Sequence, residues 1–424
     1  MFALGASSCA SGAGGRGSPG DAPRTRDLAA AVAAANAVDA AAGPWSMPEI
    51  ETLDAIRVER YQIAGGPTLI LAIDEWAPAL VIDTWLPRQD LDAALTERVY
   101  EGLRQRAQAA SAVTASQLRA AISPYWLMVG ELVVSPTGCG DRSAAAIRRA
   151  IHRLSEPLSP LRPQRRELGP SLRARLEIEL EAGRARPTLL DPLSAAITPW
   201  EQVDPRRLHI IAVGKLDRLQ VLSVLRQALP ASTPPPSAPR SVETSTRTHE
   251  IALPTDRTWV LAAWHLRDAR PADLAGIEAL AHLLAERPPG IFDAITLETS
   301  LTRSTPVPRF DVLLGLPPTV SATKAVERVE RALPELVAGG GASLPLGRIK
   351  AQLVARHLED LDELGDRSTT LAMAELFGRG VASLAEELRA IDQLTTSGLE
   401  GLARSLLGPA TRAVVIARPA GGAP

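Results

Sequence analysis

The sequence predicts an α+β protein with two homologous halves, each a mostly antiparallel sheet with helices packed on one face. Three observations lead to this class. The apolar stretch VIDTWLPR at 81–88 returns as VLAAWHLR at 260–267, 179 positions later. The segments after each stretch then alternate between strand-like and helix-like patterns in the same order. Between the two copies lies a segment rich in Pro, Ser and Thr, at 231–249, which is typical of an extended linker.

The expected elements of the repeat are recognised by their periodicity. Helices are expected where apolar residues recur three and four positions apart, and strands where apolar residues alternate or run together. The pairs, one member from each half, are helices at 90–106 and 270–287, strands at 124–136 and 309–318, helices at 143–154 and 321–333, helices at 168–183 and 346–364, and closing strands at 208–214 and 412–419. The first half should also contain an additional hairpin, in which TLILAID and ALVIDTWLP flank the turn EWAP.

The repeat divides the chain, whose 424 residues are too many for one core. Residues 1–50 are rich in Gly, Ser, Ala and Pro and are expected to be a signal remnant or disordered tether. The N-terminal α+β half should occupy 51–230, the Pro-rich linker 231–249, and the C-terminal α+β half 250–424.

The composition argues against several partners. The net charge of −2 and the aromatic content of 3% provide neither the basic surface nor the stacking side chains that nucleic-acid binding uses. No apolar run is long enough to predict a transmembrane span. A peptide ligand and a protein partner are compatible with this composition.

The two cysteines, Cys9 and Cys139, are too few and too far apart for a disulfide framework or a zinc-ribbon spacing. Cys9 follows small residues in LGASSCAS, which is similar to a bacterial lipoprotein cleavage site, where the cysteine takes the lipid. This interpretation requires a translation start upstream of Met1, because the basic and apolar segments of a signal peptide are missing. Cys9 is therefore a candidate for lipidation on the periplasmic side, and the alternative is an ordinary disordered tail on a cytoplasmic protein.

The order of the elements resembles the pitrilysin/insulinase family of zinc metallopeptidases, which includes the mitochondrial processing peptidase. The stretches that carry the resemblance are GGPTLILAIDEWAPALVIDTWLP at 65–87, LHIIAVGKLDRLQVLSVLRQAL at 208–229, and the C-terminal region 371–419. It extends over roughly residues 55–420. The resemblance implies two halves that enclose a peptide-binding chamber, usually together with a second such subunit.

The resemblance also implies a zinc motif, H-x-x-E-H, on the first helix of the first half. The matching helix at 90–106 contains Glu97 and Glu101 but no histidine, and the first histidine of the chain is His152. Catalytic Zn²⁺ needs nitrogen or thiolate ligands, whereas carboxylates alone favour a harder ion such as Mg²⁺. We therefore assign no catalytic residue, no metal ligand and no cofactor, although zinc is the cofactor of the family.

Other histidines are weak substitutes for the missing motif. His282 and Glu286 lie four positions apart on the expected helix at 270–287, which provides two ligands at most. His357, next to Glu359 and Asp360, is expected on a solvated, charged helix face.

A second functional feature of the family is an Arg and Tyr pair in the second half that helps to hold substrate. The resemblance places it within 292–310, where Arg303 and Arg309 are present. All three tyrosines of the chain lie in the first half. Arg303 and Arg309 are therefore candidates for substrate contact, and the pair itself is incomplete.

These features predict a catalytically inactive homologue of insulinase-like zinc metallopeptidases. It would act as the partner subunit of an active, zinc-containing homologue in a heterodimer, or as a peptide-binding module. Two alternatives stay open: an active zinc metalloendopeptidase with unrecognised ligands, and a structural scaffold subunit.

Overall fold

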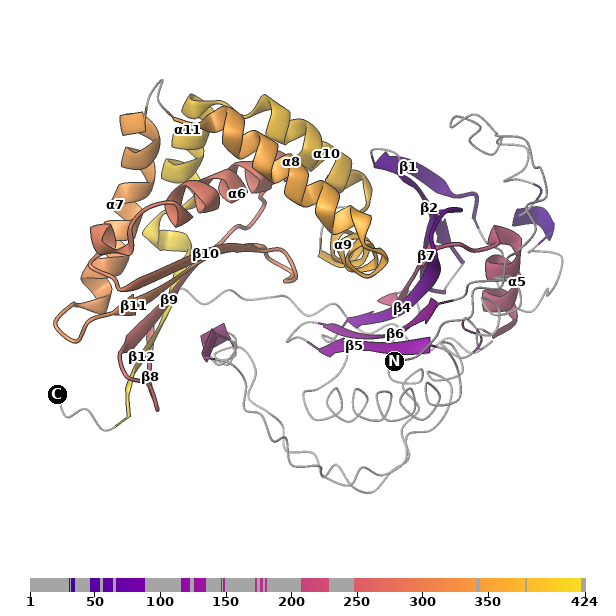
Figure 1. The fold of residues 1–424 in the computed structure, drawn as a ribbon, viewed down its shortest axis with the longest axis horizontal. Coiled ribbons are helices and arrows are strands. Elements are labelled where there is room, and N and C mark those ends of the chain that lie inside the picture. The colour runs from indigo at the N-terminus through magenta and orange to yellow at the C-terminus, as the bar shows by residue number, and fades with distance from the viewer. Residues whose placement is uncertain are drawn as a thin grey trace, which may run out of the picture.

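The structure is a computed structural model of the chain. It describes residues 46–53, 56–63, 66–87, 116–122, 126–134, 207–228, 248–340, 344–377 and 380–420, with short helical pieces at 30, 32–34, 146, 148, 172–173, 176–177 and 180. The described residues form two β-sheets, and a group of helices lies beside and between them (Figure 1).

The first sheet has seven strands in the order β1-β2-β3-β7-β4-β6-β5. Its strands are β1 Glu49–Leu53, β2 Ile56–Gln62, β3 Thr68–Ile73, β4 Ala79–Pro87, β5 Ser116–Ile122, β6 Trp126–Val134 and β7 His209–Gly214. Neighbouring strands are antiparallel except β3 and β7, which are parallel. Helix α5, Arg218–Ala228, follows β7.

The second sheet has five strands in the order β10-β11-β9-β12-β8. Its strands are β8 Thr248–Leu253, β9 Thr258–His265, β10 Thr296–Thr302, β11 Arg309–Leu316 and β12 Arg412–Pro419. The helices of this half are α6 Pro271–Ala285, α7 Ala322–Gly340, α8 Leu346–Asp362, α9 Leu364–Phe377, α10 Ala382–Gln393 and α11 Thr396–Leu406. Here β12 and β8 are the parallel pair.

The strand order confirms the internal repeat. The arrangements β3-β7-β4-β6-β5 and β8-β12-β9-β11-β10 are the same, and β1 and β2 are added to the first sheet. Trp85 of β4 and Trp264 of β9 are both fully buried. Trp85 is paired with Met128 of β6 and Trp264 with Phe310 of β11, so the repeated tryptophans occupy equivalent positions. The predicted α+β class with two mostly antiparallel sheets is therefore confirmed.

The predicted hairpin of the first half is wrong. Strands β3 and β4 do not pair, because β7 lies between them, parallel to β3 and antiparallel to β4. The run HIIAVG of β7 is apolar, and the centre of the sheet is the position that buries such a strand on both faces. In the same way β12 lies between β8 and β9. In both halves, therefore, the closing strand of the half lies between two strands that are consecutive in the sequence. Strand β8 begins at Thr248, inside the segment predicted as linker.

One face of each sheet is covered by helices of its own half. In the second half, Val260, Trp264 and Val312 belong to one large core with side chains of α6 and α7. In the first half, Leu71 and Ile82 pack with the apolar side chains of α5. This core also contains Val32, which is 5% exposed although it lies in the predicted tether, and β1 likewise begins at Glu49.

The opposite face of each sheet is covered from the other half. Ile70 and Ile211 of the first sheet pack against Leu371 of α9, which reaches across to this sheet (Figure 1). Leu176, from the first half, packs against Leu261 of the second sheet. The exchange of helical segments joins the two halves through apolar cores. Within the described ranges, none of the helices combines the length and the apolar character needed to cross a bilayer.

Candidate functional site

Two of the predicted positions lie outside the described residues. They are the lipidation candidate Cys9 and the helix at 90–106 with Glu97 and Glu101. Helix α6 is the counterpart of segment 90–106 in the sequence of the second half, because both come after a strand with the repeated tryptophan. The side chains of α6 therefore show what the second half places at this position.

His282 of α6 and Glu286, the C-cap residue of that helix, have surroundings that do not suit a metal ion. Both carboxylate oxygens of Glu286 accept hydrogen bonds from Arg348 at 2.7 Å, and these bonds lower the pKa of Glu286. Nε2 of His282 is buried without a hydrogen-bond partner in the described part of the chain. Across the described residues, no group of three or more His, Cys, Asp or Glu side chains could hold a metal ion. These residues do not fit the converging nitrogen ligands that zinc requires.

Helix α6 instead contributes Glu278 to a partly buried charged cluster with Arg303, His357 and Glu387. Nη2 of Arg303 donates to Oε2 of Glu278 at 2.8 Å and to Oε2 of Glu387 at 2.9 Å. Nε2 of His357 lies 3.3 Å from the same oxygen of Glu278. The side chains of Glu278 and Glu387 are 8% and 5% exposed. The cluster therefore joins α6, α8, α10 and the end of β10.

The position of His357 corrects the prediction of a solvated helix face. Its side chain is 11% exposed and faces Glu278 of α6 instead of Glu359 or Asp360. Residue spacing within a helix predicts contacts only between side chains of that helix. It does not reveal that a histidine in a charged stretch contacts a neighbouring helix.

The two carboxylates of the cluster have different electrostatic surroundings. Burial opposes the charge of Glu278, but the hydrogen bond with His357 and the charge of Arg303 outweigh it, so the pKa of Glu278 lies well below its usual range. For Glu387, burial outweighs the attraction of Arg303 and raises the pKa above its ordinary value. Burial also opposes the charge of Arg303, but Glu387 and Glu278 together raise the pKa of Arg303.

A cavity of about 460 Å³ adjoins this cluster. Its lining comes from Glu387 and Ser383 of α10, from the loop between β9 and α6, and from the prolines at 306 and 308. The lining includes the charged residues Arg267, Asp268 and Glu387, and a cavity of this size could accept a peptide side chain.

The substrate-contact candidates Arg303 and Arg309 both make internal ion pairs. Arg303 is held by Glu278 and Glu387, as described above. Arg309 of β11 donates to the carboxylate of Asp311 at 2.7 and 3.0 Å, and its side chain is 3% exposed. Asp311 also accepts from Thr302 of β10 at 2.7 Å. A substrate carboxylate would therefore have to compete with these acidic side chains for either arginine.

A second polar site lies where α9 meets the first sheet. The carboxylate of Asp83 on β4 is fully buried and accepts a 2.7 Å hydrogen bond from the hydroxyl of Ser368 on α9. Nε of Arg119 on β5 lies 3.3 Å from the same carboxylate. Arg119 also donates to the carbonyl of Gly365 at 2.9 Å. Burial raises the pKa of Asp83 to about 6, although Arg119 and Ser368 pull it downward.

The comparisons with known proteins concern the fold. No family model matches the sequence, and no curated protein matches it. Among solved structures, the fold is similar to a protease from Helicobacter pylori, with 13% identity and a TM-score of 0.62 over 88% of this chain and 99% of that one. It is also similar to the peptidase M16 inactive domain from Pseudomonas fluorescens, with 14% identity and a TM-score of 0.54 over 87% of this chain and 99% of that one.

The fold is that of M16-like peptidases. A third similar structure is a periplasmic protease from Escherichia coli, with 11% identity and a TM-score of 0.62. The match covers 89% of this chain and 47% of that one, so this chain spans about half of the longer protease. The predicted pitrilysin/insulinase-like architecture is thus confirmed at the level of the fold, and the identities leave activity open.

Proposed function

We propose that this chain is a non-catalytic, M16-like subunit that shapes a peptide-binding chamber with a zinc-containing homologue. One observation carries the proposal: the chain has the M16-like fold, but the segment 90–106, where the resemblance places the zinc motif, contains no histidine. The ligand chemistry of Zn²⁺ explains why this matters, because a peptidase of this kind activates water on a metal held by nitrogen ligands. The similarity to the inactive M16 domain supports the same conclusion.

The architecture suits a partner role. Strand edges of a sheet can accept an extended peptide through backbone hydrogen bonds, without any catalytic group. In the described part of the chain, β5 and β10 are edge strands of the two sheets. The buried ion pairs of Arg303 and Arg309 contribute to the framework of this second half, so we propose that they contact substrate only where a peptide replaces one of their carboxylate partners.

The test is to purify this chain and an intact H-x-x-E-H homologue from the same source separately, and then to mix them. Alone, this chain should carry no stoichiometric zinc and should show no chelator-sensitive cleavage of an unstructured peptide. In the mixture, native mass measurement should detect a heterodimer, and kcat/KM of the partner should rise severalfold. A stable interface of this kind should bury well over about 1,000 Å².

Three other results would redirect the assignment. If this chain alone binds zinc and cleaves the peptide, it is an active peptidase and the proposal is wrong. If the partner's mass and kcat/KM stay unchanged, the partner role fails. Peptide binding by this chain alone would then indicate a binding module, and the lack of such binding would indicate a scaffold.

We further propose that the chain is exported and anchored through Cys9 on the periplasmic side. The lipoprotein-like sequence around Cys9 supports this, and one of the similar folds belongs to a periplasmic protease. The gene should be expressed from its upstream start with a palmitate analogue in the medium. Wild type should be labelled in the membrane fraction, and Cys9→Ser should be unlabelled. Equal labelling of the two proteins would contradict the anchor.

A further inference from the structure

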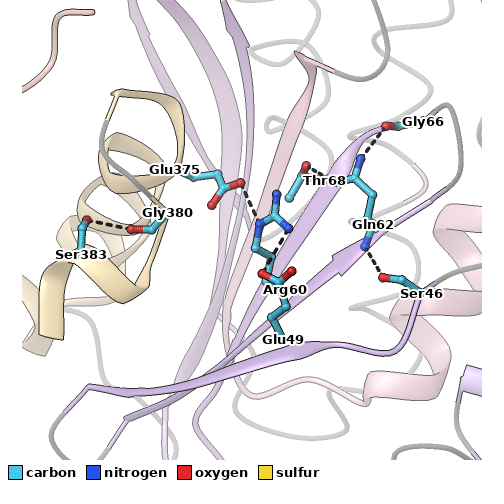
Figure 2. A network of polar contacts seen from close by, with 9 residues as sticks. All are labelled: Ser46, Glu49, Arg60, Gln62, Gly66, Thr68, Glu375, Gly380 and Ser383. Carbon is cyan, nitrogen blue, oxygen red and sulfur yellow. Dashed lines mark hydrogen bonds and ion pairs between the residues drawn. The ribbon is translucent and has the colours of Figure 1, made fainter. Parts of the chain in front are cut away.

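A pocket of about 350 Å³ lies between the β1–β2 hairpin and the turn that joins α9 to α10. Its walls come from segments more than 300 positions apart in the sequence. The residues that line it are Glu49, Glu51, Val58, Arg60, Glu375, Gly380, Val381 and Ala382. Figure 2 shows Arg60 between Glu49 and Glu375, with Gly380 on the same side as Glu375.

The strand register explains why the hairpin residues share one face. In the antiparallel pair β1–β2, Glu49 is opposite Arg60 and Glu51 is opposite Val58. Because side chains alternate between the faces of a strand, all four point to the same side of the sheet. On the other face, Ile50 is opposite Glu59. The alternation of Glu, Ile and Glu at 49–51 thus gives β1 a charged face and an apolar face.

The turn supplies the other wall. Gly380 has φ of 83°, a left-handed conformation that favours glycine, and its N–H donates to the carbonyl of Ala374 at 3.2 Å. The hydroxyl of Ser383 donates to the carbonyl of Gly380 at 2.8 Å (Figure 2). These bonds hold the start of α10 against the end of α9, where Glu375 lies.

The pocket is acidic. Among the side chains that line it, three are carboxylates and one is a guanidinium. Nε of Arg60 donates to Oε1 of Glu375 at 2.9 Å, and its Nη1 donates to Oε2 of Glu49 at 3.4 Å. Arg60 therefore neutralises one of the three negative charges, and the surplus favours a positively charged group.

One carboxylate oxygen in this wall has no partner. The side chain of Glu375 is 6% exposed, and its Oε2 is buried without a hydrogen-bond partner among the described residues. Figure 2 shows this oxygen on the side of the carboxylate that faces away from its bond with Arg60. A buried carboxylate oxygen left without a donor is unfavourable, so a ligand that carries N–H donors would be stabilised here.

We propose that this pocket binds the guanidinium or ammonium group of a basic residue in an extended peptide. The edge position of β1 selects a peptide over a free cation. In the described part of the chain, β1 pairs with β2 alone, so its other edge can accept a peptide strand. A basic side chain of that strand would lie beside Glu49 and Glu51, and the adjacent peptide residue would lie beside Ile50, which is 43% exposed. The ligand is therefore a basic residue next to an apolar residue.

The proposal deepens the proposed function, on which it rests only for the choice of a peptide as ligand.

The probe is a fluorescein-labelled peptide of alternating Thr and Val with one central Arg, and its binding to the full chain is measured by fluorescence anisotropy. A matched peptide has citrulline in place of Arg, which keeps the shape and removes the charge. The Arg peptide should bind about tenfold more tightly than the citrulline peptide, because charge-assisted hydrogen bonds to a carboxylate are lost.

The variants locate the binding. Glu375→Gln and Glu51→Gln should each weaken binding of the Arg peptide by about tenfold and leave the citrulline peptide unchanged. Glu359→Gln, at an exposed position of α8, is the matched control and should change neither. Glu51 is half-buried on the surface strand, so its variant tests the site even if Glu375→Gln fails to fold.

Equal affinity for the two peptides would overturn the proposal, as would Arg-peptide binding that Glu51→Gln and the folded Glu375→Gln leave unchanged. Competition by free agmatine as effective as that by the Arg peptide would overturn the choice of a peptide. The mixing experiment with a zinc-containing subunit reads mass and kcat/KM, so its failure is distinguishable from a failure here.

Discussion

Replacing Arg303 by methionine should lower the free energy of unfolding by about 3–5 kcal/mol. Among the described contacts, Arg303 is the permanently charged cation that bonds both Glu278 and Glu387. The two carboxylate side chains are 8% and 5% exposed, so water replaces only part of the interaction that each loses. Methionine keeps much of the volume of arginine. The loss of stability therefore comes mainly from the unpaired carboxylates, and less from a cavity.

The matched control is Arg348→Met. Arg348 makes an equally short pair with Glu286, but the two side chains are 50% and 38% exposed. Exposed pairs contribute little, and this variant should lose less than about 1 kcal/mol. Urea unfolding followed by circular dichroism measures both. Adding Glu278→Gln and Glu387→Gln to Arg303→Met should recover part of the loss, because the unpaired charges are then removed. A loss for Arg303→Met no larger than for the control would mean that water reaches these carboxylates.

The cluster also shows where prediction from sequence stops. Helix α6 could be predicted, since its apolar residues recur with helical spacing and Pro271 and Asp273 suit its first turn. Glu278 interrupts the run ADLAGIEALAHLLA, and a carboxylate buried in such a helix requires a cationic partner. That signal could have identified Glu278 as a site residue. Its partners could not be found in the same way, because they lie on other helices whose packing the sequence pattern does not encode.

The same limit applies to the sheets. Periodicity locates β6, β7, β11 and β12, whose apolar runs are long and regular. It does not reveal that β7 enters between β3 and β4, because strand order depends on which neighbours bury it. The short polar strands β8 and β10 are also missed, since THEIAL and TLETSLT have no clear apolar alternation. Glu375 and Arg60 meet only because α9 crosses to the first sheet, a contact between halves that the repeat does not imply.

The second large effect concerns the pH dependence of stability in the first sheet, where the buried Asp83 and the half-buried His209 should oppose each other. Asp83 on β4 has its pKa raised to about 6 by burial, against an ordinary value of 3.8. His209 on β7, opposite Trp85 of β4, has its pKa lowered to about 4 from 6.5, first by burial and then by the charges of Arg60 and Arg207. Each of these pKa differences corresponds to a free energy of about 3 kcal/mol.

Whether each group makes stability rise or fall with pH depends on which state, folded or unfolded, binds its proton more tightly. Between about pH 4 and about pH 6 the folded state holds a proton on Asp83 that the unfolded state has released, so this group makes stability fall as pH rises. For His209 the unfolded state holds the extra proton over about the same range, so this group makes stability rise with pH. In the wild type the two contributions largely cancel, and removing either one should expose the other.

Asp83→Asn and His209→Gln should therefore change the pH dependence in opposite directions. Relative to wild type, Asp83→Asn should be more stable near pH 7 by up to about 3 kcal/mol, and this advantage should disappear on acidification to about pH 4. Relative to wild type, His209→Gln should gain stability by a similar amount as the pH falls over that range, because it has no proton to bind on unfolding. Urea midpoints across the range measure both differences, and the contributions of all other titrating groups cancel in each comparison.

If the stability of both variants stays parallel to that of wild type at every pH, the two side chains do not have the shifted pKa values that their burial implies. If only His209→Gln differs from wild type in its pH dependence, the ion pair with Arg119 keeps Asp83 charged in the folded state. The contact between β4 and α9 would then involve a charged carboxylate instead of a protonated one.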